Sequence, residues 1–536
     1  MMNTVKINRE AFWVFLGASF LCFANIWGYP ITILDEAKNA EAAREMLLHH
    51  NLIPYFNEVL RTDKPPLHYI FMQLGYGIFG INEIGARFFG ALFGVAFITY
   101  FYLFLNKFTS RNIARMATFV LMSSFFWIQE FHLAVPDPYF IVLLCLSWLF
   151  FYNYYHDQKH LNASTFSQKL LWLFYIFVGL ATLAKGPLAI GLTGLIVLCF
   201  LLFNKELNGK IFSKYQVILG GLLILIIAAP WFIWIHYKTD GAFTQGFFYH
   251  HNLKRFQEVN SGHGGIFLVT WAFVILGIFP FGAFVPQSLW HAWKFRKRND
   301  LVNFSLIIAL VVIIFFSISS TKLPNYTLPA IPFLAILIAY YFEEIFQFGT
   351  LKNIWSYIST GLISLVSMAI PVAIFILFQH DLVQELQIIF TLIAALVVLI
   401  GLFFVWKSLI KNQLQYLIMS IGSLWMVLGV IIFYMIYPNL SRIEPVIQSY
   451  SVIENNNVVV FDNYDPAFNF NYQSTYMTFN NTSELMSYLK DNPSSLVLTK
   501  DRSIKDNPDF AEGFKVLFNE PSVFENYRTL ILKKVE

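Results

Sequence analysis

The 536-residue sequence contains only three cysteines and few charged residues, and these shortages exclude several classes of protein. Cys22, Cys145 and Cys199 all lie within apolar runs and show no CxxC spacing, so they predict packing residues rather than disulfides or a cysteine metal site. Charged residues make up 13% of the chain, and a formal net charge of +4 is too small for nucleic-acid binding. The excess of basic residues must have another explanation.

Apolar residues dominate what is present. The chain is 57% hydrophobic and contains 59 Phe, 27 Tyr and 13 Trp. Apolar runs of roughly 20 residues, the length that crosses a bilayer, recur along most of it and are separated by short polar loops. The sequence therefore predicts a polytopic α-helical membrane protein. About thirteen candidate spans lie near residues 11–29, 84–105, 113–131, 139–155, 170–184, 188–203, 215–235, 265–288, 301–320, 327–343, 354–379, 387–406 and 415–437.

Three segments depart from this pattern. Residues 67–79 are apolar but short and follow two prolines, which favours a re-entrant or interfacial segment. The first run follows Lys6 and Arg9 but lacks a small-x-small cleavage site, which favours a retained anchor. From Pro438 on, short strands are expected in "NNVVVFD", "SSLVLTK" and "YRTLILKKV", and a helix with a Thr or Ser N-cap in "TSELMSYLKDN".

These patterns predict two domains. Residues 1–437 would form the membrane domain, with an outer loop over residues 30–83 that holds juxtamembrane helices, and residues 438–536 would form a small α/β domain outside the membrane. Basic residues occur in alternate loops, which the positive-inside rule places in the cytoplasm: Lys107, Arg111, Arg115, Lys159, Lys169, Lys205, Lys210, Lys214, Lys294, Arg296, Lys297, Arg298, Lys407 and Lys411. The opposite loops and the C-terminal segment then share the outer face.

Two adjacent carboxylates begin the polar stretch "DEAKNAEAAREML" on this outer face. Asp35 could N-cap the helix and Glu36 would lie in its first turn, a structural role that explains the local pattern by itself. Other outer loops add Asp63 and Lys64 in "RTDKPPLHY" and Asp137 between two prolines in "VPDPYF". A lysine held by a Pro-Pro pair is a point charge suited to a phosphate, although it could also anchor to lipid headgroups.

Basic residues on the same face occur beside helix breaks. Lys185 precedes a Gly-Pro pair, and "TKLPNYTLPAIP" holds Lys322 and Tyr326, an arrangement suited to binding an anion. "FFYHHNLKRF" contains His251 and Arg255, where the adjacent histidines are a weak metal signal and a headgroup-binding loop is the alternative. Acids that activate an acceptor and bases that stabilise a leaving phosphate together predict transfer from a lipid phosphate donor.

The ordered motifs "DEAKNAEAAREML", "DKPPL", "VPDP", "AKGP", "NLKRF" and "KLPNYTLPAIP" resemble those of the bacterial polyprenyl-phosphate-dependent glycosyltransferases of the GT-C type. The lipid A aminoarabinose transferases are the more similar branch and the protein O-mannosyltransferases the more distant one. The resemblance covers roughly the first 340 residues. It implies a thirteen-helix membrane domain with juxtamembrane helices and a periplasmic C-terminal domain, in the bacterial inner membrane with the active site facing the periplasm.

The resemblance also implies roles for individual residues. The catalytic positions fall on Asp35 and Asp137, with Glu36 adjacent, and the donor-phosphate positions on Lys64, Arg255, Lys322 and Tyr326, with Lys185 nearby. The chain differs from the aminoarabinose transferases at Lys38 and Asn39, where they carry Arg-Tyr, at Asp63, where they carry Glu, and at Asn252, where they carry His. These positions are expected to contact the sugar or the acceptor, so the resemblance identifies the reaction class rather than the sugar.

The expected reaction moves a sugar from undecaprenyl phosphate, with inversion, to lipid A or a related glycolipid. Proteins and surface glycans remain alternative acceptors, and a lipid transporter or a scaffold remains the non-enzymatic alternative. No cofactor is required by the pattern. A divalent cation near Asp35, Asp63 or His251 is compatible with it.

Overall fold

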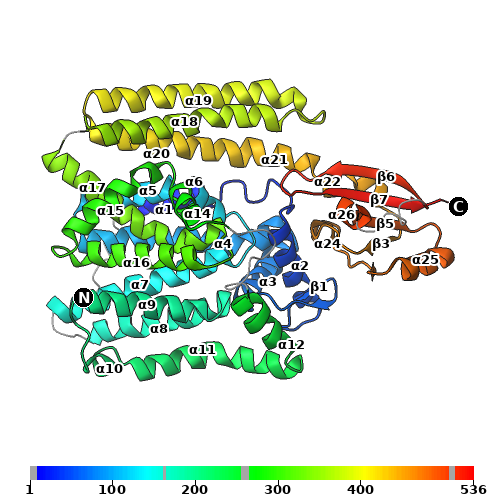
Figure 1. The fold of residues 1–536 in the computed structure, drawn as a ribbon, viewed down its shortest axis with the longest axis horizontal. Coiled ribbons are helices and arrows are strands. Elements are labelled where there is room, and N and C mark those ends of the chain that lie inside the picture. The colour runs from blue at the N-terminus through cyan, green and yellow to red at the C-terminus, as the bar shows by residue number, and fades with distance from the viewer. Residues whose placement is uncertain (1–8, 161–164, 255–264, 350, 506–512, 536) are drawn as a thin grey trace.

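The computed structural model describes residues 9–160, 165–254, 265–349, 351–505 and 513–535. It consists of a large helical part and a C-terminal part built on a five-stranded sheet (Figure 1). Helices α2 (Leu34–Leu48) and α3 (Leu67–Phe79) lie between these two parts, together with the hairpin of β1 (Tyr55–Phe56) and β2 (Val59–Leu60). The predicted fold class is confirmed.

Each predicted span contains at least one helix in the structure. The helices concerned are α1 (Arg9–Cys22), α4 (Glu83–Phe108), α5 (Arg111–Met122), α6 (Phe125–Glu130), α7 (Asp137–His160), α8 (Thr165–Lys185), α9 (Leu188–Phe203), α11 (Val217–Lys238), α14 (Phe267–Gly277), α15 (Val285–Phe295), α16 (Asp300–Ile318), α17 (Ile331–Phe348), α18 (Ile354–Leu377), α19 (Gln384–Ile410) and α20 (Leu414–Ile431). Within the described residues, nine helices are long and apolar enough to cross a membrane, or up to ten if one bent pair is a single span.

Four of the thirteen predicted spans are therefore shorter or broken. Helices α1 and α9 have only 14 and 16 residues. The span expected at 113–131 is interrupted where the hydroxyls of Ser123 and Ser124 donate to carbonyl oxygens of the preceding turn, an alternative to regular helix bonding. The span expected at 265–288 bends by 120° between α14 and its continuation. At this bend a Cβ on Gly282 would lie 1.9 Å from the carbonyl oxygen of Ile275, so only glycine fits.

The membrane helices differ in how deeply they are buried. In α7, 94% of the apolar window is buried, against 28% in α11, α18 and α19. Helix α7 is thus the centre of the bundle, and α18 and α19 form a layer at its edge (Figure 1). The prolines of "VPDP" stand at the start of this central helix, so Asp137 is fixed to the most rigid element of the fold.

Helix α3 has the bounds expected of the short apolar segment. Its 13 residues extend roughly 20 Å, less than the roughly 30 Å of a bilayer core. It packs closely on α4, because a Cβ on Gly75 would lie 2.0 Å from the carbonyl oxygen of Gly85. It also contacts α2, where the Tyr76 hydroxyl donates to the carbonyl of Ala40 over 2.9 Å. A helix of this length does not span a membrane by itself.

The C-terminal sheet has the order β4-β3-β5-β7-β6. Its strands are β3 (Val458–Phe461), β4 (Thr478–Phe479), β5 (Leu496–Lys500), β6 (Phe514–Pro521) and β7 (Arg528–Lys534), with α24 (Ala467–Tyr472), α25 (Thr482–Asp491) and α26 (Asp501–Lys505) beside them. The three predicted strands are β3, β5 and β7. The expected Thr or Ser cap of α25 is wrong, because Asn481 accepts the bond from the Ser483 N–H.

The sheet domain is attached to the outer loop. Buried residues of α2 and α3 form one apolar cluster with residues of the C-terminal part, among them Met46, Tyr69, Phe468 and Val460. Polar contacts reinforce this cluster: Asn57 donates to the carbonyl of Tyr476 and accepts from its N–H, over 2.8 and 2.7 Å. The loop that follows α1 and the C-terminal domain are therefore packed as one body.

A buried ion pair fixes the start of α2. Arg87, in α4, donates through Nε and Nη2 to the two carboxylate oxygens of Glu36 over 2.7 and 3.0 Å, and its Nη1 donates to the carbonyls of Ile26 and Tyr29. The Glu36 carboxylate also accepts from the N–H of Ala134. Both charged side chains are almost fully buried. One guanidinium thus joins α2, α4 and the turn after α1.

Replacing Arg87 by Met should destabilise the protein by about 3–5 kcal/mol, because Glu36 would remain as a buried charge without its partner. Adding Glu36→Gln should recover part of that loss. Thermal unfolding of the detergent-solubilised protein, followed by size-exclusion chromatography, measures both variants. Equal unfolding temperatures for the single and the double variant would contradict the pair's role.

Candidate active site

Asp35 lies in the first turn of α2 with an exposed carboxylate. The helix begins at Leu34 and its N-cap position, Ile33, offers no side-chain bond, so the expected capping role of Asp35 is wrong. The extended backbone at Ile33 starts the helix two residues earlier than the sequence suggested. The described part of the chain gives the Asp35 carboxylate neither a hydrogen bond nor an ion pair, so it is available to a ligand.

The neighbours of Asp35 on α2 have other environments. Glu36 is 1% exposed and its carboxylate is occupied by Arg87 and the backbone, which makes it a structural residue. Asn39, expected to contact the sugar or acceptor, is also 1% exposed and accepts from the Tyr69 hydroxyl of α3, so it has no free surface. Lys38 is half-buried, and burial lowers the pKa of its ammonium group, with Arg61 adding to the effect.

The loop before α3 contains an ion pair that the sequence analysis missed. Arg61 donates to both oxygens of Asp63 over 2.5 and 2.9 Å, so Asp63 is held by a fork-like contact rather than left for a sugar. Arg61 is 9% exposed, and its Nη1 has no hydrogen-bond partner among the described residues. Lys64 follows, half-buried, and its charge acts on His68 of α3. The spacing of Arg61 and Asp63 in "RTD" was the feature of the sequence that could have predicted this ion pair.

A second charged group lies at the start of α7. Lys185 contacts Asp137 over 2.5 Å, and Asn325 donates to the same carboxylate oxygen over 3.0 Å. The Lys185 ammonium also lies 5.2 Å from the centre of the Tyr326 ring. Lys185 is thus paired with an acid. Lys322 is 7% exposed and donates to the Ser319 carbonyl over 2.6 Å, so it stiffens the turn before residue 324.

Glu130 lies between these two charged groups, and the sequence analysis did not single it out. It ends α6 and is 5% exposed. The charged side chains that act on it are Asp137, Lys185 and Asp35. Asp35 therefore has charged neighbours in both groups, and the start of α2, the end of α6, the start of α7 and the end of α8 together form one candidate active site. A glutamate inside an apolar run was the signal for this residue.

The π-helix η1 (Gln245–Lys254) begins beside both loops of this site. A Cβ on Gly246 would lie 2.3 Å from the Thr62 hydroxyl oxygen. A Cβ on Gly186, whose φ of +97° requires glycine in any case, would lie 2.6 Å from the Phe247 ring. The segment that leads to Arg255, the expected basic residue, thus starts at the site. Arg255 itself, and the side chains of His251 and Asn252, lie outside the described residues.

The described residues contain one group of three side chains with metal-ligand geometry: Glu45, His49 and Glu58. It lies at the end of α2 opposite to Asp35, where His49 Nε2 and a Glu58 carboxylate oxygen are 2.9 Å apart. Neither Asp35 nor Asp63 belongs to such a group within the part of the chain described.

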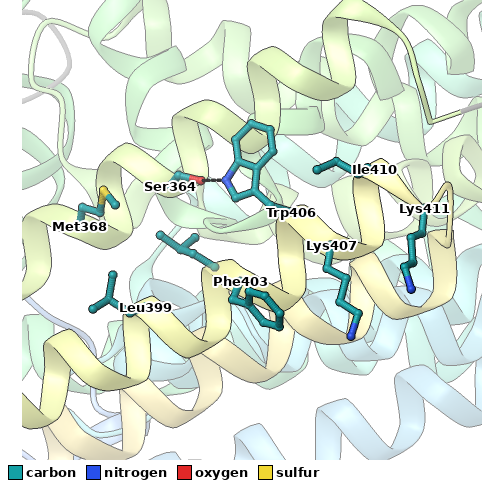
Figure 2. A pocket seen from close by; sticks show the side chains of 9 residues that line it. Ser364, Met368, Leu399, Phe403, Trp406, Lys407, Ile410 and Lys411 are labelled. Atoms are coloured by element: carbon teal, nitrogen blue, oxygen red, sulfur yellow. Dashed lines mark hydrogen bonds between the residues drawn. The ribbon is translucent and has the colours of Figure 1, made fainter.

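A groove at the edge of the bundle is not part of this site. It lies between α18 and α19, where Trp406 Nε1 donates to the Ser364 hydroxyl over 3.0 Å (Figure 2). Apolar side chains such as Met368, Leu399 and Phe403 line it, with Lys407 and Lys411 as its cations. It contains none of the predicted site residues.

The C-terminal domain contacts the start of α2 through the loop before β7. The Glu525 carboxylate, far along the chain, lies near this first turn, since the backbone of Leu34 and the charge of Asp35 both act on it. This loop is held in turn by Glu444, whose carboxylate accepts from the N–H groups of Val523 and Phe524 over 2.8 and 3.1 Å. Asp35 is therefore positioned by both parts of the structure.

The family model of the dolichyl-phosphate-mannose-protein mannosyltransferases matches residues 63–234. An uncharacterized protein from Aquifex aeolicus is 30% identical over 328 residues, which cover 61% of this chain and 62% of the relative. An undecaprenyl phosphate-alpha-4-amino-4-deoxy-L-arabinose arabinosyl transferase from Erwinia tasmaniensis is 26% identical over 376 residues, 67% of this chain and 65% of the relative. The matches thus span under two thirds of these relatives' length.

The fold is similar over nearly the whole chain to the crystal structure of ArnT from Cupriavidus metallidurans bound to undecaprenyl phosphate. The TM-score is 0.76, the identity is 19%, and 98% of each chain is covered. Taken together, the sequence matches and the fold agree with the resemblance inferred from the motifs: the chain is similar in sequence to lipid-phosphate-dependent glycosyltransferases over part of its length, it shares the fold of a GT-C glycosyltransferase, and it is a multi-pass membrane protein.

Stability should depend on the protonation of Glu444. This side chain is fully buried, and burial raises its pKa to about 7 from 4.5, against the opposing effect of its hydrogen bonds. The stabilisation from its protonated form is complete below about pH 4.5 and is lost as the pH rises through about 7. Glu444→Gln should therefore reduce the fall in unfolding temperature between pH 5 and 8.

Glu45, whose pKa burial also raises to about 7, is unchanged in this variant, so the dependence should shrink rather than vanish. Glu484→Gln, at an exposed position of α25, is the matched control and should keep the wild-type profile. An unaltered pH profile in Glu444→Gln would contradict the assignment.

Proposed function

We propose that this chain, which has the fold of a GT-C glycosyltransferase, is an inverting membrane glycosyltransferase that uses a polyprenyl-phosphate sugar. Asp35 carries the proposal: its carboxylate is exposed and unpaired among the described residues, while every other acid of the site is paired or buried. Rigid positioning of one free carboxylate suits a catalytic group. The relatives named as undecaprenyl-phosphate arabinosyl transferases support the same class of donor.

The donor phosphate is proposed to meet Lys64, with Lys322, Tyr326 and Arg255 assisting, while its polyprenyl chain lies against the apolar surface of the membrane helices. Departure of a phosphate requires cationic stabilisation rather than a strong acid. The bond between the anomeric carbon and the phosphate oxygen breaks, and its electron pair leaves with the phosphate. Lys185 serves mainly to hold Asp137 in this proposal, because the two side chains are paired.

The acceptor is proposed to attack the anomeric carbon from the face opposite to the phosphate. If its nucleophile is a hydroxyl, Asp35 removes the proton as general base. If the nucleophile is a phosphate oxygen of lipid A, that oxygen is already anionic, and Asp35 orients the acceptor or the sugar. Lipid A or a related glycolipid is the proposed acceptor, and a protein or a surface glycan is the second candidate. Asp137 and Glu130 complete the acidic side of the site.

The site is proposed to face the periplasm from the bacterial inner membrane. The distribution of basic residues over alternate loops supports this orientation, because lysine and arginine cluster in the opposite loops, as in Lys294 to Arg298, whereas the short loop before Asp137 has neither. The domain division at residue 438 is part of the proposal, with the sheet domain on the same side as α2. A transporter would instead need charged residues in the middle of its spans.

Asp35→Asn should lower the rate of sugar transfer at least 100-fold, because general-base catalysis contributes about 10²–10⁴. Turnover in washed membranes with a lipid-phosphate-linked sugar, and binding of undecaprenyl phosphate to the purified variant, separate chemistry from donor binding. Binding should be unchanged. Asp381→Asn, an exposed acid in the loop between α18 and α19, is the control. Near-wild-type turnover in Asp35→Asn would remove this residue from catalysis.

Lys64→Gln should weaken the binding of undecaprenyl phosphate roughly tenfold, the loss of one charge-assisted contact to a phosphate. Native mass spectrometry of the protein in nanodiscs measures it. Lys411→Gln, an exposed lysine beyond the end of α19, should bind like wild type. Equal affinity of the Lys64 variant and this control would refute the assignment of the donor phosphate.

A further inference from the structure

The groove between α18 and α19 follows an apolar stripe that ends in two lysines. Its volume is about 470 Å³. Four of the lining side chains recur at every fourth position along α19: Leu399, Phe403, Lys407 and Lys411. Residues at this spacing lie on one face of a helix, and Figure 2 shows both lysine side chains extending from the same side of α19 as the Phe403 ring. The groove is thus apolar along its length and cationic at one end.

Two aromatic side chains mark the depth of the lysine end in the membrane. Trp406 Nε1 donates to the Ser364 hydroxyl over 3.0 Å, which fixes the indole between α18 and α19. The centre of the Tyr357 ring lies 6.4 Å from that of Trp406. Tryptophan and tyrosine concentrate at the level of the lipid headgroups. The lysines therefore lie at headgroup level, and the apolar part of the groove extends into the hydrocarbon core.

The groove opens toward lipid. Only 28% of the apolar window is buried in α18 and in α19, which form the outermost layer of the bundle. Met368 on α18 and Leu399 and Phe403 on α19 are exposed. An apolar surface that a membrane helix presents to the bilayer is covered by lipid chains. The occupant of the groove is therefore a lipid rather than a soluble ligand.

The length of the groove fits a lipid of one leaflet. From Leu399 to Lys411, α19 rises by roughly 18 Å at about 1.5 Å per residue. Half of the bilayer core is about 15 Å thick. A lipid whose acyl chain lies along the apolar stripe would therefore place its headgroup beside the two lysines.

The charges at the mouth of the groove have no acidic partner in the part of the chain that the structure describes. The ammonium groups of Lys407 and Lys411 form neither a hydrogen bond nor an ion pair there, and that of Lys407 lies 5.5 Å from the centre of the Phe403 ring. The other lining side chains are uncharged. A zwitterionic headgroup brings its own cation to this mouth, whereas an anionic headgroup complements the lysines.

This groove is separate from the candidate active site. Helix α20 begins just after the lysine end of α19 and leads back to the C-terminal domain, so the lysines lie at the end of the bundle opposite to that domain (Figure 1). The start of α2, with Asp35, lies beside the C-terminal domain. The positive-inside rule makes the leaflet at the lysine end the cytoplasmic one. A lipid in the groove therefore occupies the leaflet away from the candidate active site.

Single side-chain bonds join α18 to its neighbours. The Ser359 hydroxyl donates to the carbonyl of Ala283 over 2.7 Å, and Trp425 Nε1, from α20, donates to the Ser367 hydroxyl over 3.1 Å. A lipid in the groove would contact α18 through Met368 and α19 through Leu399. It would therefore strengthen the attachment of the outer layer to itself and raise the stability of the folded protein.

We infer that the groove between α18 and α19 binds one anionic phospholipid, with an acyl chain along the apolar stripe and the headgroup phosphate at Lys407 and Lys411. This lipid is neither donor nor acceptor of the sugar. It is a structural partner that fastens the layer of α18 and α19, and its site would exist whether or not the proposed function is correct.

The test uses the delipidated full-length protein in detergent, titrated with phosphatidylglycerol, phosphatidylcholine or undecaprenyl phosphate and followed by native mass spectrometry. Lys407→Gln with Lys411→Gln should weaken phosphatidylglycerol binding roughly 25-fold, about fivefold for each lysine near an anionic headgroup. Its affinities for the other two lipids should not change. Lys205→Gln with Lys210→Gln is the matched control, because these exposed lysines follow α9 at the same end of the bundle.

Thermal unfolding gives the second measurement. Phosphatidylglycerol should raise the unfolding temperature of the wild type and of the control more than that of the groove variant. Undiminished phosphatidylglycerol binding by the groove variant, or an equal loss in the control, would refute a specific site. Equal binding of phosphatidylglycerol and phosphatidylcholine by the wild type would refute selection by charge. Weaker binding of undecaprenyl phosphate by the groove variant would assign the groove to polyprenyl phosphates instead.

Discussion

The buried contact between Glu36 and Arg87 is the interaction on which the site depends. It fixes the first turn of α2 to α4 and to the turn after α1, and so determines where the neighbouring Asp35 points. A charge pair this deeply buried gains little net stability over an apolar pair, but it tolerates very few arrangements. Of the two adjacent carboxylates, Glu36 is thus bonded within the fold, and Asp35 remains exposed.

Much of the fold could be predicted because membrane helices and buried strands leave strong local signals. Apolar runs located the long helices between α4 and α20, and the alternation in "YRTLILKKV" located β7. The bend at Gly282 and the break after Met122 were missed, since they depend on close backbone contacts rather than on hydropathy. The site was predicted less completely. The sequence indicated Asp35 by its place at the start of a polar stretch and Asp137 by its two flanking prolines. The pairing of Lys185 and the burial of Asn39 could not be predicted, because they depend on contacts between distant segments.

The C-terminal domain contributes to the structure around the candidate active site. Glu444 holds the loop that carries Glu525, and the Glu525 carboxylate lies near the start of the helix of Asp35, so residues more than 400 positions apart meet at the site. The sequence contained no signal for this, because the carboxylates of the domain are scattered and none forms a motif. The N-cap residue of this helix, Ile33, forms no side-chain bond, and the sheet domain is close to the helix start through Glu525.

The central claim is that this chain transfers a sugar from a lipid phosphate to an acceptor outside the cytoplasm. Mass spectrometry of lipid A and of periplasmic glycopeptides, from cells with the wild-type protein, with Asp35→Asn or with none, tests it most directly. Lipid A is expected to lose the same sugar-sized mass in both defective strains, and the glycopeptides are expected not to change. No difference in either pool between the wild-type and the defective strains would contradict it.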